Sequence, residues 1–430
     1  MILNAGMSIS RSGLRLTAKL LQNQQRALAR HFQAGIIVST TTTTTMAASF
    51  TTSASTEQKQ DKRLFTPGPL LTEFQTKAAM LRDLGSRDVE FMETIKYIRT
   101  KILDVAGISR EEFTMIPLQG SGTFSVEAAI MTMVPKTGGK LLLCVNGSYG
   151  LRMIEIAKYS GIEVVVVRGK EDEKLDVGAV EKILKEDPSI TNVAMVHCET
   201  SSGVIHPIHE MAEVVRKCAP NATFLVDAMS SFGVFQIDMS NIDFLVTSAN
   251  KCIEGIPGFG IVIARKEKLL QCKGNCRSLS LDIVEQYLGL EKSGQFRFTP
   301  PTHAILGFKK AVELWEEEGG VDGRAKRYKE NRRILREGMK EFGFKEFLSD
   351  EHEGYIITSF FYPNDPHFDF AQFYSKLNAL DQVIYPGKVT DADCFRIGNI
   401  GDLKPDDMRH LLVCIEQVCN DMNISLPVNY

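Results

Sequence analysis

The feature of this sequence that most constrains its fold is the alternation of short apolar runs with helical stretches between about Lys140 and Ala264. The runs have the length of buried strands, and they are Leu141–Val145, Val164–Val167, Val193–Val196, Phe224–Val226, Phe244–Val246 and Ile261–Ala264. Two segments between them, Val177–Lys185 and Ile208–Cys218, carry apolar residues at helical spacing. Strands that alternate with helices predict an α/β fold, in which helices flank both faces of a mainly parallel sheet. Ligands of such sheets bind beyond the carboxyl ends of the strands, so the polar residues after each run are candidates for a site.

The pattern changes after about Pro300. Two helical stretches, Ala304–Glu318 and Arg324–Phe342, are separated by Gly319 and Gly320. Two apolar runs and a last helical stretch follow, at Tyr355–Tyr362, Phe395–Ile397 and Met408–Val418. We therefore expect a large domain over residues 64–318 and a smaller C-terminal α+β domain over residues 319–430.

Composition narrows the classes of partner. The chain has 430 residues, of which 43% are hydrophobic, so it can bury a large core. A formal net charge of -3 argues against binding to nucleic acid or to an anionic membrane. No segment approaches the roughly 18 to 20 continuous apolar residues that span a bilayer. The nine cysteines include no C-x-x-C pair, so we expect reduced thiols rather than a zinc site or a disulfide framework. These features favour a soluble protein with a small-molecule partner.

The first 56 residues differ from the rest of the chain, because they contain no Asp or Glu. Basic residues recur through this leucine-containing stretch, at Arg11, Arg15, Lys19, Arg26 and Arg30. Such a composition is typical of a mitochondrial transit peptide and predicts a protein of the mitochondrial matrix. The alternative is a tail without an address, which would leave the protein in the cytoplasm. We expect residues 1–56 to form a disordered leader and the folded part to begin near Leu64.

Two residues that follow neighbouring runs could hold a cofactor. Lys251 comes after Phe244–Val246 and precedes a turn rich in Gly and Pro, so its amine could form an imine with an aldehyde. Asp227 ends the preceding run, and the order of the strands could bring both side chains to one edge of the sheet. A carboxylate there can pair with the protonated ring nitrogen of pyridoxal 5'-phosphate (PLP). The alternatives are a solvated surface lysine and an aspartate that caps a helix.

The segment Gln119–Thr123 reads Q-G-S-G-T and opens an apolar helical stretch. Glycines and hydroxyls at a helix N-terminus leave backbone N–H groups free to bind an anion, and the helix dipole favours negative charge. The segment is not a Walker loop, because no Gly-Lys-Ser/Thr follows, and no third glycine completes a G-x-G-x-x-G pattern. It predicts a phosphate site, with a plain helix start as the alternative.

Eight strings of the sequence form a recognisable set. They are T-P-G-P from Thr66, Q-G-S-G-T from Gln119, N-G-S-Y-G from Asn146, H-C-E-T from His197, V-D-A-M-S-S-F-G from Val226, S-A-N-K-C-I-E-G-I-P-G-F-G from Ser248, F-R-F-T-P-P-T-H from Phe296 and F-R-I-G-N-I-G from Phe395. In this set and its order, from about Leu64 to Val418, the chain resembles the class V aminotransferases. The resemblance implies the fold type I architecture of PLP-dependent transferases, and a homodimer.

The resemblance also implies roles for individual residues. Lys251 would be the catalytic residue and would carry PLP through its amine. The other cofactor contacts would be Ser121, Gly122, Thr123 and Asn250 on the phosphate, Tyr149 stacked on the ring, Thr200 on the phenolic oxygen, Asp227 on the ring nitrogen, and Thr299 on the phosphate of the neighbouring subunit. Packing in the core is the alternative for Tyr149.

The resemblance further implies transfer of the amino group of 2-aminoethylphosphonate to pyruvate in phosphonate degradation, which gives phosphonoacetaldehyde and L-alanine. Arg396 resembles the arginine that binds the α-carboxylate of amino and keto acids, a role that suits a planar guanidinium. A surface arginine is its alternative. The residue that binds the phosphonate stays open, and the candidates are Arg82, Arg87, Arg152 and Arg297.

Three other functions are alternatives to this one. Another class V aminotransferase, such as one that acts on alanine and glyoxylate, would need the same cofactor residues. A nicotinamide-dependent dehydrogenase is disfavoured by the missing third glycine. A non-catalytic scaffold of the same fold is disfavoured because Lys251 and Asp227 are both present.

Overall fold

The computed structural model describes residues 61–387, 389 and 392–430, so the predicted leader lies outside the described residues. Gln60–Tyr430 form one compact unit. The described chain begins close to the expected start of the folded part, since its first strand, β1, is Arg63–Leu64.

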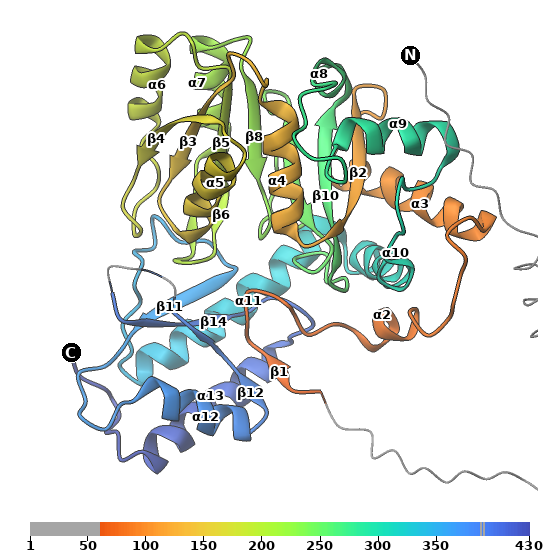
Figure 1. The fold of residues 1–430 in the computed structure, drawn as a ribbon. Helices are drawn as coiled ribbons and strands as arrows, with labels where there is room; N and C mark the ends of the chain where they lie inside the picture. Colours follow the sequence, from red (N-terminus) through yellow and green to blue (C-terminus); the bar gives the residue numbers. More distant parts are fainter. Residues whose placement is uncertain (1–60, 388, 390–391) are drawn as a thin grey trace, which may run out of the picture. The chain divides into compact units, whose positions relative to one another are not determined.

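A seven-stranded sheet forms the larger part of the described chain together with its helices, and its strand order is β2-β10-β9-β8-β5-β3-β4 (Figure 1). Its strands are β2 Phe113–Gly120, β3 Lys140–Val145, β4 Glu163–Arg168, β5 Asn192–Val196, β8 Thr223–Asp227, β9 Phe244–Ser248 and β10 Gly258–Arg265. β10 runs antiparallel to both of its neighbours, β2 and β9, and the other pairings are parallel. The predicted mainly parallel sheet is therefore confirmed, and each of the six predicted runs is a strand. β2 was not predicted.

Helices cover this sheet because its central strands are buried along their whole length, so both faces need a partner. α4 (Gly122–Met133) packs on β9 and β10, and α5 (Ser148–Tyr159) packs on β3 and β4. The remaining helices of this part are α2 Phe74–Ala78, α3 Val89–Val105, α6 Val177–Glu186, α7 Ile208–Cys218, α8 Lys266–Gln271, α9 Ile283–Ser293 and α10 Thr302–Glu317. The predicted α/β fold, with helices around the sheet, is confirmed.

A second, smaller sheet and its helices follow along the chain. The sheet has the order β11-β14-β13, with β11 Ile357–Phe361, β14 Cys394–Gly398 and β13 Tyr385–Pro386, all antiparallel. The helices of this part are α11 (Gly320–Glu341), α12 (Phe370–Ala379) and α13 (Pro405–Asp421), and α13 packs on both α11 and α12. This part has its own core, in which Leu335, Phe360, Phe395 and Ile415 are fully buried. α10 ends and α11 begins on either side of Gly319, and the division into domains there stays a prediction.

The start of the described chain is joined to this second part. β1 pairs in parallel with β12 (Gln382–Val383), and the backbone N–H of Gly398 donates to the carbonyl of Phe65. Residues 63–71, which we call the N-terminal arm, thus lie against the C-terminal sheet.

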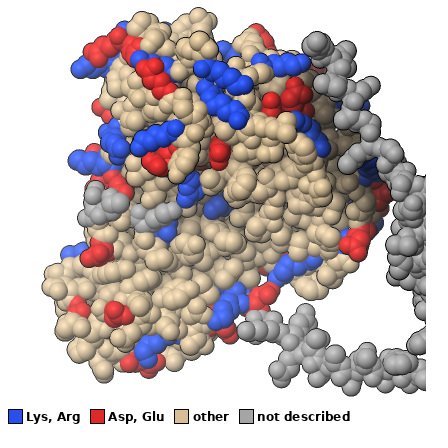
Figure 2. Space-filling view, in the orientation of Figure 1, with Lys and Arg blue, Asp and Glu red and all other residues tan. Residues whose placement is uncertain are grey.

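The surface carries mixed charge. On the face shown in Figure 2, Lys and Arg are interspersed with Asp and Glu. Among the helices of the described part, none combines the length and the apolar character that crossing a membrane requires.

Candidate active site

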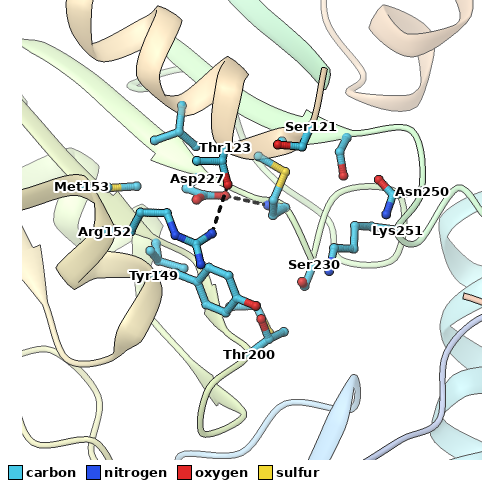
Figure 3. Close-up of a pocket in the computed structure, with 16 residues that line it drawn as sticks. Ser121, Thr123, Tyr149, Arg152, Met153, Thr200, Asp227, Ser230, Asn250 and Lys251 are labelled. Atoms are coloured by element: carbon cyan, nitrogen blue, oxygen red, sulfur yellow. Dashed lines mark hydrogen bonds between the residues drawn. The ribbon is translucent and has the colours of Figure 1, made fainter. Parts of the chain in front are cut away.

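A cavity of about 190 Å³ lies at the carboxyl ends of β5, β8 and β9 (Figure 3). Eight of the ten predicted site residues line it: Ser121, Gly122, Thr123, Tyr149, Thr200, Asp227, Asn250 and Lys251. They come from helix N-termini and strand ends that are far apart in sequence. The parallel strands bring these residues together, because the carboxyl ends of parallel strands meet at one edge of a sheet.

Lys251 lies in the turn between β9 and β10 and points into the cavity (Figure 3). Its Nζ donates a hydrogen bond to the carbonyl of Pro67 in the N-terminal arm. Gly68 sits against the amine, since a Cβ there would lie 2.7 Å from Nζ, and its φ of +127° favours glycine. Burial lowers the pKa of Lys251 to about 8, and the positive charge of Arg396 adds to this effect. A buried amine of this kind has a much larger neutral fraction near neutral pH than a surface lysine has.

Asp227 ends β8, directly beside β9, and its residue pairs with Val246. The residue is 4% exposed, and its Oδ1 accepts a hydrogen bond of 2.9 Å from the backbone N–H of Met229. Burial raises the pKa of Asp227 to about 7, and the negative charge of Glu199 adds to the rise. The side chain caps a turn rather than a helix, and no basic side chain of the described residues forms an ion pair with it. A buried carboxylate without a cationic partner suits a ligand that brings a positive charge, such as a pyridinium nitrogen.

The N-terminus of α4 forms another wall of the cavity. Ser121 precedes the helix in an extended conformation, and its side chain makes no capping hydrogen bond. A Cβ at Gly122 would lie 2.5 Å from Sδ of Met229, so the helix approaches the turn after Asp227 closely. Asn250 lies on the same side of the cavity as Ser121 (Figure 3). Backbone N–H groups, two hydroxyls and an amide in this corner are a suitable donor set for a phosphate.

Glu199 was not among the predicted site residues, although it organises this wall. Its carboxylate is fully buried and accepts hydrogen bonds from the backbone N–H groups of Tyr149 and Gly150, each at 3.2 Å. The hydroxyl of Ser201 donates to it at 2.6 Å, and burial raises its pKa. Glu199 therefore fixes the first turn of α5, which carries Tyr149, against the strand that leads to Thr200. Its string, H-C-E-T, marked the segment, but the contact with α5 spans 50 residues of sequence and could not be read from it.

Arg396 lies in the middle of β14 and is 2% exposed, so the alternative of a surface arginine is wrong. Its Nε donates to the carbonyl of Pro386 at 2.9 Å and its Nη1 to the carbonyl of Thr200 at 2.5 Å. The guanidinium stacks over the ring of Tyr385 at 5.3 Å. Arg396 does not line the cavity itself, but it is bonded to Thr200, which does. Burial lowers its pKa.

Thr299 is the other predicted residue that does not line the cavity of its own chain. It is exposed, and its carbonyl accepts a hydrogen bond of 3.0 Å from Gln119.

The four candidate arginines for the phosphonate lie in different places. Arg152 lines the cavity, where its guanidinium faces Thr123 and Tyr149 (Figure 3). Arg82 is exposed and paired with Glu90, and Arg87 is exposed. Arg297 donates to the carbonyl of Leu279.

Comparisons with known proteins agree with this geometry. The family model of class V aminotransferases matches residues 53–379. A curated relative from Bacillus cereus, the 2-aminoethylphosphonate–pyruvate transaminase, is 47% identical over 352 residues, which cover 81% of this chain and 95% of the relative. The protein of the same name from Bacillus anthracis is 46% identical over the same shares.

Solved structures show the same fold at lower identity. The ureidoglycine–glyoxylate aminotransferase of Bacillus subtilis superposes with a TM-score of 0.77 at 20% identity, over 85% of this chain and 95% of that one. The pyridoxamine–pyruvate aminotransferase of Mesorhizobium loti gives 0.77 at 22% identity, over 86% and 95%. From the extent of the family match and the identity to these curated relatives, the chain belongs to the class V aminotransferases.

Proposed function

We propose that this protein transfers the amino group of 2-aminoethylphosphonate to pyruvate and so produces phosphonoacetaldehyde and L-alanine. The observation that carries the proposal is the convergence of Lys251 and Asp227 in one buried cavity at the ends of β9 and β8. The choice of substrates is supported by the 46–47% identity to relatives named for this pair, over 81% of the chain.

The residues that line the cavity fit PLP. Its phosphate would lie against Ser121, Gly122, Thr123 and Asn250, its ring against Tyr149, and its phenolic oxygen near Thr200. Asp227 would pair with the ring nitrogen, which removes the cost of an unpaired buried carboxylate. When bound, PLP supplies an electron sink that stabilises negative charge on the substrate carbon next to nitrogen.

Lys251 has two tasks in this proposal. Its amine holds the cofactor before the substrate arrives, and afterwards it moves a proton at the substrate carbon that carries the nitrogen. The lowered pKa, about 8, keeps part of the amine neutral near physiological pH, so that Nζ can accept this proton. In the second half-reaction the same group returns a proton to the carbon derived from pyruvate.

Arg396 would bind the substrate anion. The carbonyls of Pro386 and Thr200 fix its Nε and Nη1, and its Nη2 has no partner among the described residues. A guanidinium held in this way can pair with a carboxylate and orient it relative to the cavity.

A comparison of amine donors tests the proposed reaction. Half-reactions of the loaded enzyme with 2-aminoethylphosphonate, with ethylamine and with alanine are followed by the absorbance of the cofactor. We expect 2-aminoethylphosphonate to react far faster than ethylamine, which lacks the phosphonate, and pyruvate to restore the starting spectrum. Faster turnover of alanine with glyoxylate than of 2-aminoethylphosphonate with pyruvate would instead favour an alanine–glyoxylate aminotransferase.

We also propose a homodimer, in which Thr299 reaches the cofactor phosphate of the partner subunit. The support is that Thr299 is exposed and lies outside the cavity of its own chain. Sedimentation of the loaded protein should give twice the mass of one chain, and Thr299→Ala should weaken PLP binding. A monomer with full activity would contradict this proposal.

Finally, we propose that the acid-poor leader directs the protein to the mitochondrial matrix. The support is the composition of the leader, because the residues before Glu57 include five Lys or Arg and no Asp or Glu. Residues 1–60 fused to a fluorescent protein should carry it to mitochondria, and replacement of the leader arginines by glutamine should abolish this. A fusion that stays in the cytoplasm would refute the assignment.

A further inference from the structure

Arg152 is a basic residue of the cavity that the proposed reaction does not use. It lies in the first turns of α5, three residues after Tyr149, so both side chains emerge on the same face of the helix. The residue is only partly buried, and no carboxylate of the described residues forms an ion pair with it. A guanidinium that lines this cavity without a carboxylate partner is therefore a candidate for a functional role.

Two contacts hold this guanidinium in place (Figure 3). Its Nη1 donates a hydrogen bond of 3.0 Å to the hydroxyl of Thr123, at the N-terminus of α4. Its Cζ lies 4.8 Å from the centre of the Tyr149 ring, which is a cation–π contact. Arg152 thus joins two predicted cofactor contacts that belong to different helices.

We propose that Arg152 is a positioning residue of the cofactor pocket, which acts through Thr123 on one side and through Tyr149 on the other. Thr123 would meet the cofactor phosphate and Tyr149 the ring, so their separation must match the length of the cofactor. Arg152 sets that separation because it contacts both. The inference rests on the cofactor proposed above.

The charge of Arg152 supports the same role. Asp227 also lines the cavity, where burial raises its pKa and the negative charge of Glu199 raises it further. The positive charges of Lys251 and Arg152 and the N–H of Met229 act in the opposite direction. When the amine of Lys251 is neutral, Arg152 is the remaining cation in this set. It then favours the ionised carboxylate, which is the form that pairs with a protonated ring nitrogen.

Arginine suits this position better than lysine. A planar guanidinium can donate to a hydroxyl at its edge while its face lies on an aromatic ring, whereas an ammonium group cannot keep both geometries. Arg152→Lys therefore preserves the charge but not the double contact, and Arg152→Met removes the charge while keeping most of the apolar stem.

Two other roles for Arg152 predict different effects of its removal on PLP binding. If its guanidinium occupied the face of Tyr149 that the cofactor ring needs, its removal would strengthen PLP binding. If it bound the substrate phosphonate, its removal would leave PLP binding unchanged and would raise the KM for 2-aminoethylphosphonate alone.

The test is a titration of the cofactor-free full-length protein with PLP, read by absorbance and by quenching of protein fluorescence. It compares wild type with Arg152→Met, Arg152→Lys and the control Lys158→Met, which removes a cation from an exposed position of the same helix. We expect Arg152→Met to raise the Kd for PLP by about tenfold, as one lost cation–π contact and one lost hydrogen bond allow. Arg152→Lys should raise the Kd for PLP by a smaller factor, and Lys158→Met should have the Kd of the wild type.

Two further measurements separate positioning from general damage to the fold. In a Tyr149→Leu background the effect of Arg152→Met should shrink, because one of its two targets is gone. The melting temperature of the cofactor-free protein should change little in Arg152→Met. Tighter PLP binding, an unchanged Kd, or a fall in melting temperature that accounts for the weaker binding would each overturn the proposal. A wild-type chain that binds no PLP would refute the proposed cofactor itself, which is a separate outcome.

Discussion

Replacement of Arg396 tests whether the two proposed substrates bind to the same anion site. In Arg396→Ala the site loses its guanidinium, whereas Arg396→Lys keeps a positive charge without the planar fork. The residue is 2% exposed, and two backbone carbonyls fix its orientation, so an anion bound there would be largely desolvated. Loss of such a partner costs about 2 to 5 kcal/mol. This corresponds to a fall in kcat/KM of about 30-fold to 5000-fold for Ala, and we expect a smaller fall for Lys.

The assay is single-turnover kinetics of each half-reaction, read from the cofactor spectrum. Pyruvate should react more slowly with the pyridoxamine form, because its carboxylate has lost its partner. The reaction with 2-aminoethylphosphonate should also slow, because one cavity must hold each anion in turn while the reacting carbon faces the same lysine. The melting temperature serves as the control, since the carbonyls of Pro386 and Thr200 lose a donor in Arg396→Ala.

Two results would refute this reasoning. Normal reactivity of pyruvate in a folded Arg396→Ala protein would show that Arg396 is not the anion anchor. A defect confined to pyruvate would place the phosphonate elsewhere, and Arg152 would then be the first candidate because it lines the cavity.

Three further predictions concern the cofactor. The loaded protein should be yellow, and in Lys251→Ala borohydride should no longer link PLP to the chain; retained linkage would remove Lys251 from its role. Asp227→Ala should weaken PLP binding and slow half-transamination by at least about tenfold, and Asp227→Glu by less, because only the second keeps a charge near the ring nitrogen; equal rates in both variants would contradict the pairing. The rate at which the cofactor-free protein takes up PLP should rise with pH and level off above about 8, because the neutral amine is the nucleophile and burial lowers the pKa of Lys251 to about 8. At pH about 7.5 roughly a quarter of the amine would be neutral, against about 0.1% for an ordinary lysine; a rate that still climbs tenfold per unit above about pH 9 would show that the pKa is not lowered.

The sequence predicted the central sheet well because its strands are buried on both faces. Such strands appear as continuous apolar runs, and all of those named between Lys140 and Ala264 are strands in the structure. β2 was missed because Pro117 and Gln119 interrupt its apolar pattern. Proline is tolerated there because β2 is an edge strand with β10 on one side.

The positions of the site residues could be predicted only where a residue follows a strand. Lys251 and Asp227 could be brought together from sequence alone, since each follows a strand and the strands are adjacent and parallel. The contacts that Glu199 and Pro67 make in the site could not be predicted from the sequence. Both depend on contacts between segments far apart in sequence, about 50 residues for Glu199 and α5 and 184 for Pro67 and Lys251. A pattern of apolar residues carries no information on such pairs.

The N-terminal arm limits how far the chain can be shortened from its N-terminus. β1 completes a pair with β12, and Pro67 accepts a hydrogen bond from Lys251. Phe65 accepts one from Gly398 at the end of β14, and Leu71 accepts one from Asp402 in the loop that follows. A cut upstream of Lys62 leaves these bonds in place. A cut beyond Gly68 would unpair β12 and uncover the lysine amine, even though it removes none of the residues that line the cavity. Chains that begin upstream of Lys62 should therefore bind PLP, and chains that begin beyond Gly68 should not, as expected when a terminal segment is tied into the fold.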